Sequence, residues 1–237
     1  MIDFFSGIPL DVLLKAVVVH GILISVFIYM TVKIRKRGGK YAKVYLSAFY
    51  FSTAMGFVIN FIFIFIFVPW IVKILYFFTL YFLFLGTFSL LIFNLIIYKS
   101  EKIITREKQL IILIILSIFT WGMILIPNGL VMNESTNWYP QYNLTFFLYL
   151  IIVLTFGSVG PIIYLSIKIY QNFELEQLKK RWAYFGWGLI LLFTFAYGTL
   201  FSHAFSIPNI RSTWSLISLF LVIGSSALLY YGVVRKN

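Results

Sequence analysis

The sequence predicts an all-α integral membrane protein made of one bundle of seven transmembrane helices. Hydrophobic residues make up 62% of the 237 residues and charged residues only 11%, whereas a soluble domain carries about 45–50% apolar and about 25% charged residues. The apolar residues gather into seven runs, each near the roughly 20 residues that cross a hydrocarbon core. The segments between the runs are short, so almost nothing remains for a domain outside the membrane.

The predicted spans are placed by these runs at residues 10–34, 44–67, 72–98, 109–126, 143–168, 182–204 and 212–234. The nine residues before the first run contain no Lys or Arg, and no small-residue cleavage site follows a short apolar core. We therefore expect the first run to be retained as a span and not removed as a signal peptide.

The breaks between the runs are polar, charged or proline-containing: RKRGGKYAK, VPW, KSEKIITREK, the long segment 127–142, QNFELEQLKKR and SIPNIR. In the long segment, Pro127, Asn128 and Gly129 predict a turn that ends the fourth helix. QNFELEQLKKR, residues 171–181, is predicted to extend the fifth helix because Glu176 and Lys180 have the i,i+4 spacing of a helical ion pair.

The orientation is predicted by the basic residues, because sixteen of the 19 Lys and Arg fall at one set of loops and at the C-terminus. Only Lys15, Lys73 and Arg211 fall on the other side. Cytoplasmic loops are enriched in Lys and Arg, so the N-terminus is predicted outside and the C-terminus in the cytoplasm of a multi-pass cell-membrane protein. The net charge of +12 then indicates contact with anionic lipid headgroups, and not with nucleic acid.

Catalytic and cofactor chemistry finds little support. The chain has no Cys, and none of its seven acidic residues lies deep in a predicted span, where pumps and proton-coupled transporters usually need one. The last span lacks the lysine that retinal proteins require. His20 and His203 differ in predicted depth by more than about 10 Å at ~1.5 Å per residue, which argues against haem or metal ligation by this pair. We expect no enzymatic activity, no metal and no cofactor.

A set of polar residues in the outer half of the spans forms the candidate ligand site. His20 is too deep in the first span for its side chain to reach the headgroups, and no carboxylate lies at its depth. Lys15 is closer to the surface, can extend to the headgroups and has Asp11 as an i,i+4 partner. The alternative to a ligand pocket is ordinary hydrogen bonding between helices. The candidates are Lys15, His20, Asn60, Tyr197, Thr199 and His203.

The fifth span contains a candidate hinge, TFGSVGP at residues 155–161. Pro161 removes a backbone hydrogen bond and is predicted to kink the helix in its cytoplasmic half. Gly157 and Gly160 permit close approach of neighbouring helices. The segment is interpreted either as a hinge in a moving helix or as ordinary packing.

Seven spans in about 235 residues, an outer N-terminus and short basic inner loops resemble the seven-helix sensory region at the N-terminus of some prokaryotic membrane histidine kinases. The resemblance covers nearly the whole chain and transfers no functional residue. The sequence ends three residues after the last span, at VVRKN, so the resemblance implies a stand-alone sensor that signals through a partner.

The leading hypothesis is a non-enzymatic receptor or sensor that binds a small or lipidic ligand in its outer half. Its signal would pass to a protein bound at the cytoplasmic loops, residues 171–181 among them. One alternative is a structural or accessory subunit of a larger membrane complex. A second alternative is a facilitator for small neutral solutes, although Pro140 and Gln141 fall in a loop and not in a helix, unlike the pair in triple-helix sugar carriers.

Overall fold

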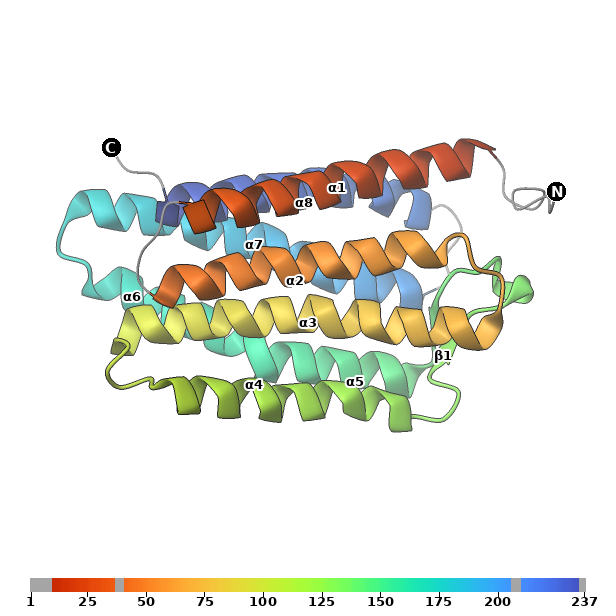
Figure 1. Ribbon diagram of the computed structural model, residues 1–237, viewed down its shortest axis with the longest axis horizontal. Helices are drawn as coiled ribbons and strands as arrows, with labels where there is room; N and C mark the ends of the chain where they lie inside the picture. The colour runs from red at the N-terminus through yellow and green to blue at the C-terminus, as the bar shows by residue number, and fades with distance from the viewer. Residues whose placement is uncertain (1–9, 37–40, 206–209, 235–237) are drawn as a thin grey trace.

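The computed structural model describes the backbone of residues 10–36, 41–205 and 210–234, and the side chains of residues 17–36, 42–205 and 213–233. Within these ranges it contains seven helices that are long and apolar enough to cross a membrane. The predicted all-α fold, with seven helices able to span a membrane, is thereby confirmed for this part of the chain. Figure 1 shows all of them running nearly along the long axis of the molecule.

The helical segments follow one another with short connections. Their bounds are α1 Leu10–Lys36, α2 Tyr41–Phe63, α3 Pro69–Lys99, α4 Arg106–Trp121, α5 Leu144–Leu154, α6 Gly160–Asn172, α7 Glu176–Ala204 and α8 Ile210–Val234. A 3-10 turn, η1 Gly122–Leu125, follows α4. A π-helical turn, η3 Thr155–Val159, joins α5 to α6, so these three segments form one continuous span.

Two helix boundaries differ from the prediction between the second and third spans. α2 ends at Phe63, before the predicted residue 67, and the chain turns through residues 64 and 65. α3 begins at Pro69, before the predicted residue 72. Proline is favoured in the first turn of a helix because its missing N–H has no intrahelical acceptor there.

The prediction that residues 171–181 extend the fifth helix is wrong. α6 ends at Asn172 and α7 begins at Glu176, so residues 176–181 belong to the next helix. Phe173 has extended backbone angles, and its ring packs 5.9 Å from that of Trp182 in α7, which turns the chain back on itself. Glu176 then lies in the first turn of α7, where the helix dipole favours a negative charge.

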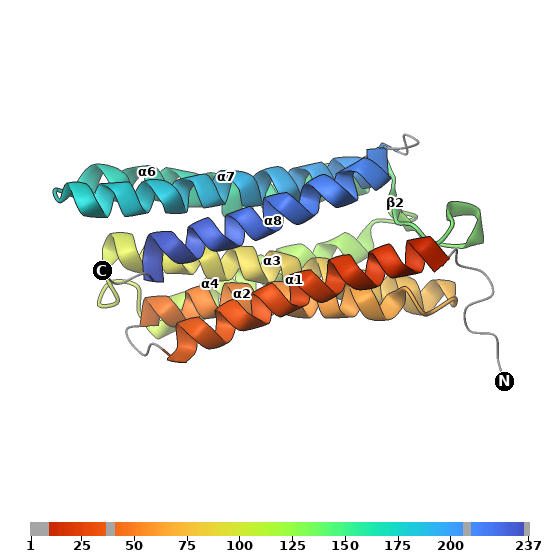
Figure 2. The same ribbon diagram turned by 90° about the horizontal axis from the view of Figure 1, so that it is seen from above.

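The helices form two layers, with α1, α2, α3 and α4 packed in sequence order in one and α8, α7 and the α5–α6 span in the other. Contacts between α1 and α8, between α3 and α6, and between α4 and α5 join the layers. Figure 2, turned by 90°, separates α7 and α8 from α1 and α2 along the viewing direction of Figure 1.

Aromatic side chains fill the space between α1, α2 and α8. The ring of Phe27 in α1 lies 5.5 Å from that of Tyr50 and 5.7 Å from that of Phe57, both in α2. The Tyr50 hydroxyl donates a hydrogen bond of 2.9 Å to the backbone oxygen of Ser226 in α8. Its burial among apolar rings makes that bond important, since an unpaired buried hydroxyl is costly.

The pair α7–α8 packs with its backbones in close approach. A Cβ atom on Gly188 of α7 would lie 2.9 Å from the backbone nitrogen of Leu229. A Cβ atom on Gly232 of α8 would lie 2.8 Å from the carbonyl oxygen of Arg181. Small residues permit such close approach between membrane helices.

The two ends of the bundle differ in structure. At one end, called the hairpin end, β1 Leu130–Val131 pairs antiparallel with β2 Gln141–Tyr142, and a 3-10 turn, η2 Glu134–Thr136, lies between them. Pro140 and Gln141 therefore lie outside the helices, as predicted. The other end, called the basic end, carries the α3–α4 and α6–α7 connections, which lysines and arginines flank.

Candidate functional site

The six residues predicted to bind a ligand lie on α1, α2 and α7. The side chain of Lys15 lies outside the described part of the chain, and the other five are all half-buried. In α1, the ring of His20 lies 6.3 Å from that of Phe61 in α2, one residue after Asn60. The structure therefore brings His20 to the α2 turn that carries Asn60, while their ligand-binding role stays a prediction.

Tyr197 in α7 connects the candidate ligand residues to the candidate hinge. Its hydroxyl oxygen lies 2.7 Å from the Oγ1 atom of Thr155, the first residue of the π turn η3. Both groups can donate or accept this bond. A candidate ligand-binding side chain is thus in direct contact with the candidate hinge segment.

Thr199 in α7 joins α7 to α8. Its Oγ1 atom accepts a hydrogen bond of 3.1 Å from the indole nitrogen of Trp214 and donates one of 2.8 Å to the backbone oxygen of Phe195. The Thr199 hydroxyl therefore has partners within the bundle. This arrangement is of the kind expected for hydrogen bonding between membrane helices.

His203 lies near the end of α7, in an aromatic cluster beneath the hairpin. Its ring is 5.4 Å from that of Tyr142 in β2 and 6.2 Å from that of Tyr76 in α3. The hydroxyls of Tyr76 and Tyr142 are hydrogen-bonded to each other. Burial, together with the neighbouring Tyr76, raises the pKa of Tyr142 well above its usual value. Tyr142 therefore stays protonated at neutral pH and keeps this bond, which ties the hairpin to α3.

The candidate hinge of Gly157, Gly160 and Pro161 coincides with an irregular turn. η3 has π-helical hydrogen bonding, and the N–H of Gly160 donates to the carbonyl of Thr155 five residues earlier. A proline in a regular α-helix clashes with the carbonyl four residues before it, which for Pro161 belongs to Gly157. The wider turn before Pro161 relieves that clash. Such turns are frequent at functional sites, and the hinge role stays a prediction.

A buried polar chain in the basic half of the bundle was missed by the sequence analysis. Asn94 in α3 has no exposed surface, and its Oδ1 atom accepts a hydrogen bond of 3.0 Å from the Oγ atom of Ser166 in α6. The backbone oxygen of Ser166 accepts a bond of 2.9 Å from the indole nitrogen of Trp182 in α7. The sequence did contain a signal, an asparagine within the apolar run LLIFNLII.

These bonds hold the α5–α6 span to α7 on both sides of the π turn. Thr155 is bonded to Tyr197 at the start of the turn, and Ser166 is bonded to Trp182 about two helical turns beyond its end. The segment between these two attachments contains Gly157, Gly160 and Pro161. This segment contains the irregular π-helical backbone. A change in the angle or register between the two attachments would therefore occur mainly in this segment.

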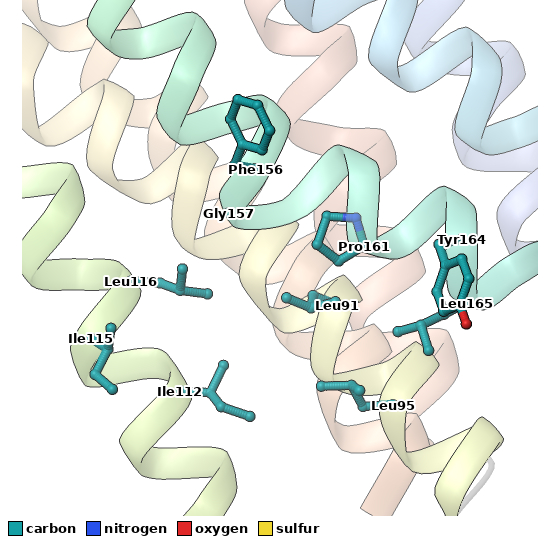
Figure 3. Close-up of a pocket in the computed structure, with 10 residues that line it drawn as sticks. All are labelled: Leu91, Leu95, Ile112, Ile115, Leu116, Phe156, Gly157, Pro161, Tyr164 and Leu165. Atoms are coloured by element: carbon teal, nitrogen blue, oxygen red, sulfur yellow. The ribbon is translucent and has the colours of Figure 1, made fainter.

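The same turn borders an apolar groove of about 430 Å³. Figure 3 shows α4 on one side of the groove and the π turn with α6 on the other, while Leu91 and Leu95 of α3 lie between them. The lining residues are Leu91, Leu95, Ile112, Ile115, Leu116, Phe156, Gly157, Pro161, Tyr164 and Leu165. All of these side chains are hydrocarbon except for the phenol hydroxyl of Tyr164.

The groove exists because α4 is attached mainly near its two ends. At the basic end, Gln109 is buried and accepts a hydrogen bond of 2.8 Å from the Tyr45 hydroxyl of α2. At the other end, the Tyr149 hydroxyl of α5 donates to the backbone oxygen of Phe119. The same hydroxyl occupies the space that a Cβ atom on Gly122 would need, so a larger residue there would require the Tyr149 side chain to move.

Comparison with known proteins gives no match. No family model matches the chain, and no curated protein or solved structure is significantly similar to it.

Proposed function

We propose that the chain is a non-enzymatic sensor of the cell membrane, with its hairpin end outside and its basic end in the cytoplasm. A small or lipidic ligand would bind among the polar side chains of α1, α2 and α7. The signal would pass through α6 to a protein partner at the basic loops, as in the kinase sensory regions that the chain resembles. The observation that carries the proposal is the 2.7 Å contact between Tyr197 and Thr155.

The contact supports coupling because it joins the candidate ligand residues to the π turn. The far side of the turn is fixed by Ser166, through Asn94 and Trp182. A π turn contains one residue more than an α turn, so conversion between the two shifts the following helix by about 1.5 Å and rotates it by about 100°. A partial change of the turn would move the helix less, and helix shifts of about 1–2 Å are a known means of transmitting a signal. The shifted segment ends at Asn172, next to the α6–α7 connection.

Ligand binding is tested with the purified full chain in detergent and a library of polar metabolites and lipids. We expect at least one compound to raise the melting temperature, and His20→Ala and Asn60→Ala to reduce that shift. Ile118→Ala is the matched control because Ile118 is exposed on α4 and away from these residues. A library without any stabilising compound would contradict the proposed site, and so would shifts that are identical in His20→Ala, Asn60→Ala and Lys15→Ala.

Coupling is tested with spin labels on Glu107→Cys in α4 and Asn172→Cys in α6, both exposed at the basic end. The chain has no native Cys, so the labels report only these positions. We expect the stabilising compound to change the distance between the labels measured by electron resonance. Tyr197→Phe should abolish the change because it removes the bond to Thr155 and leaves the ring in place.

Tyr170→Phe is the matched control for Tyr197→Phe, since it removes an exposed hydroxyl from α6. A distance change that survives in Tyr197→Phe would show that Tyr197 does not transmit the signal. Loss of the change in both variants would show that the loss is not specific to the contact with Thr155.

The accessory-subunit alternative is supported by the apolar outer face of α4. Its exposed residues include Leu110, Ile111, Ile114, Ile118 and Phe119, each more than half exposed. A face of this breadth suits either lipid or another transmembrane helix. Recovery of a stoichiometric partner in mild detergent would favour the subunit, and recovery of the chain alone or as a homodimer would count against it.

A further inference from the structure

We propose that the groove between α3, α4 and α6 binds an acyl chain of an anionic phospholipid, with the headgroup at the basic end beside Lys168. This second site does not depend on the proposed outer ligand site. The two proposals share only the π turn, and each can fail without the other.

The lining of the groove is almost entirely hydrocarbon. The groove volume of about 430 Å³ lies within the ~300–1,000 Å³ of small-ligand sites. Its ten lining residues offer hydrocarbon and one phenol hydroxyl, so the groove favours an apolar chain over a polar solute. Ile115, Phe156 and Tyr164 line it and remain 46%, 75% and 59% exposed, which shows that the groove is open at its surface.

The groove lies between membrane-length helices, close to their basic ends. All three bordering segments belong to helices that are long and apolar enough to cross a membrane. Ile112 lies six residues after the start of α4, and Leu95 lies four residues before the end of α3. At ~1.5 Å per residue these positions are about 6–9 Å from the helix ends, so the opening faces the acyl region of one leaflet. The ligand presented there is a lipid chain.

Basic side chains predominate at the end of the groove near the α3–α4 connection. The ammonium of Lys168 lies 5.9 Å from the centre of the ring of Tyr164, a lining residue. The α3–α4 connection and its flanks add Lys99, Lys102, Arg106 and Lys108, against the carboxylates of Glu101 and Glu107. Cations therefore outnumber acids where the headgroup of a lipid in the groove would lie, which favours an anionic headgroup over a zwitterionic one.

Occupancy of the groove would bear on the backbone beside it. A chain between α4 and α6 would contact Gly157, which lies in the π turn, and Pro161, which lies two residues after its end. We infer that a bound chain stabilises the π turn by holding Leu116 of α4 and the α6 wall at their present separation. The lipid would then set the conformation of the same turn that contacts Tyr197.

The test is native mass spectrometry of the full chain in detergent, titrated with dioleoylphosphatidylglycerol and, separately, dioleoylphosphatidylcholine. The two lipids share their acyl chains and differ in headgroup charge. We expect the anionic lipid to bind about fivefold more tightly, because one lysine near a headgroup contributes about that factor. Lys168→Gln should reduce the preference and leave phosphatidylcholine binding unchanged. Lys180→Gln, on α7, is the matched control and should keep the preference.

The acyl part of the site is tested by filling the groove. Ile112→Trp places a large ring in it and should weaken both lipids about fivefold or more, whereas Ile111→Trp, exposed on another face of α4, should not. Leu95→Phe, on α3, is a second filling variant with the same expectation should Ile112→Trp fail to fold. Circular dichroism and size-exclusion chromatography establish folding of each variant.

Three outcomes would overturn the proposal. The first is equal affinity for the two lipids, and the second is lipid binding that the filling variants leave unchanged. The third is a change from dimer to monomer in the filling variants without any loss of lipid, which would assign the groove to a second copy of the chain.

Discussion

Asn94 is the residue whose burial has the largest expected consequence. It has no exposed surface, its Nδ2 atom donates to the backbone oxygen of Leu90 at 2.9 Å, and its Oδ1 atom accepts from Ser166. Hydrogen bonds between membrane helices contribute about 0.6–2 kcal/mol each. The amide thus holds α6 to α3 at a place where the surrounding side chains are apolar.

We predict that Asn94→Leu lowers the free energy of unfolding by about 1–2 kcal/mol, because Ser166 loses its acceptor while the side-chain volume is nearly kept. Equilibrium unfolding in mixed detergent micelles measures the change. Asn172→Leu, at an exposed position at the end of α6, is the control and should have little effect. Equal stability of Asn94→Leu and the native chain would contradict the role given to the amide.

The sequence could supply candidate site residues but not their partners. Tyr197, Thr199 and His203 could be selected because polar residues are rare in an apolar span and the topology placed all three in one half. Their contacts with Thr155, Trp214 and Tyr142 depend on how each helix is rotated about its axis. In a membrane protein both the lipid-facing and the core-facing sides are apolar, so hydropathy carries little information on that rotation.

At the scale of secondary-structure elements, the sequence predicted a kink or hinge at Pro161 but not a π turn. The sequence shows the proline but not the type of turn, because the choice between a kinked α-helix and a π turn depends on neighbouring helices. Here the hydroxyl of Tyr197 bonds the first residue of the turn, and Gly157 faces Leu116 of α4 and Phe88 of α3. The strands β1 and β2 were missed for a simpler reason, since two residues are too few to show an alternating pattern.

We predict that Pro161→Ala stabilises the backbone of the α5–α6 span at η3, because alanine supplies the backbone donor that proline lacks. The unfolding free energy should rise by about 1 kcal/mol or more, since a proline inside a helix costs about 3 kcal/mol. Hydrogen exchange of peptides covering residues 155–165, followed by mass spectrometry, should become slower.

Pro127→Ala is the control for Pro161→Ala, because Pro127 lies in the exposed turn before the hairpin. It should leave exchange in residues 155–165 unchanged. Unaltered exchange and stability in Pro161→Ala would show that the π turn is held by its neighbours and not by the proline.

At the scale of the whole molecule, the number of spans and their order followed from hydropathy alone. The arrangement in two layers did not, because it depends on which helices pack across the bundle, such as α1 on α8 and α3 on α6. The orientation in the membrane rests on the distribution of Lys and Arg and stays a prediction.

We predict that Ser135→Cys, at the hairpin end, reacts with a membrane-impermeant maleimide in intact cells, and that Asn172→Cys, at the basic end, reacts only after lysis. Both positions are exposed, and the native chain has no Cys to give a background signal. The positive-inside rule is the physical reason. Labelling of Asn172→Cys but not Ser135→Cys in intact cells would reverse the orientation.

The π turn also bears on which changes in length the chain can tolerate. In a regular transmembrane helix, gain or loss of one residue turns everything beyond it by about 100° and exchanges buried for lipid-facing side chains. The turn at Thr155–Val159 already holds one residue more than an α-helical turn needs. With Pro161→Ala in place, deletion of a single residue there would leave Asn94, Ser166 and Trp182 in register. The α5–α6 span is therefore expected to lose one residue without a change in the side chains that α6 packs against α3 and α7.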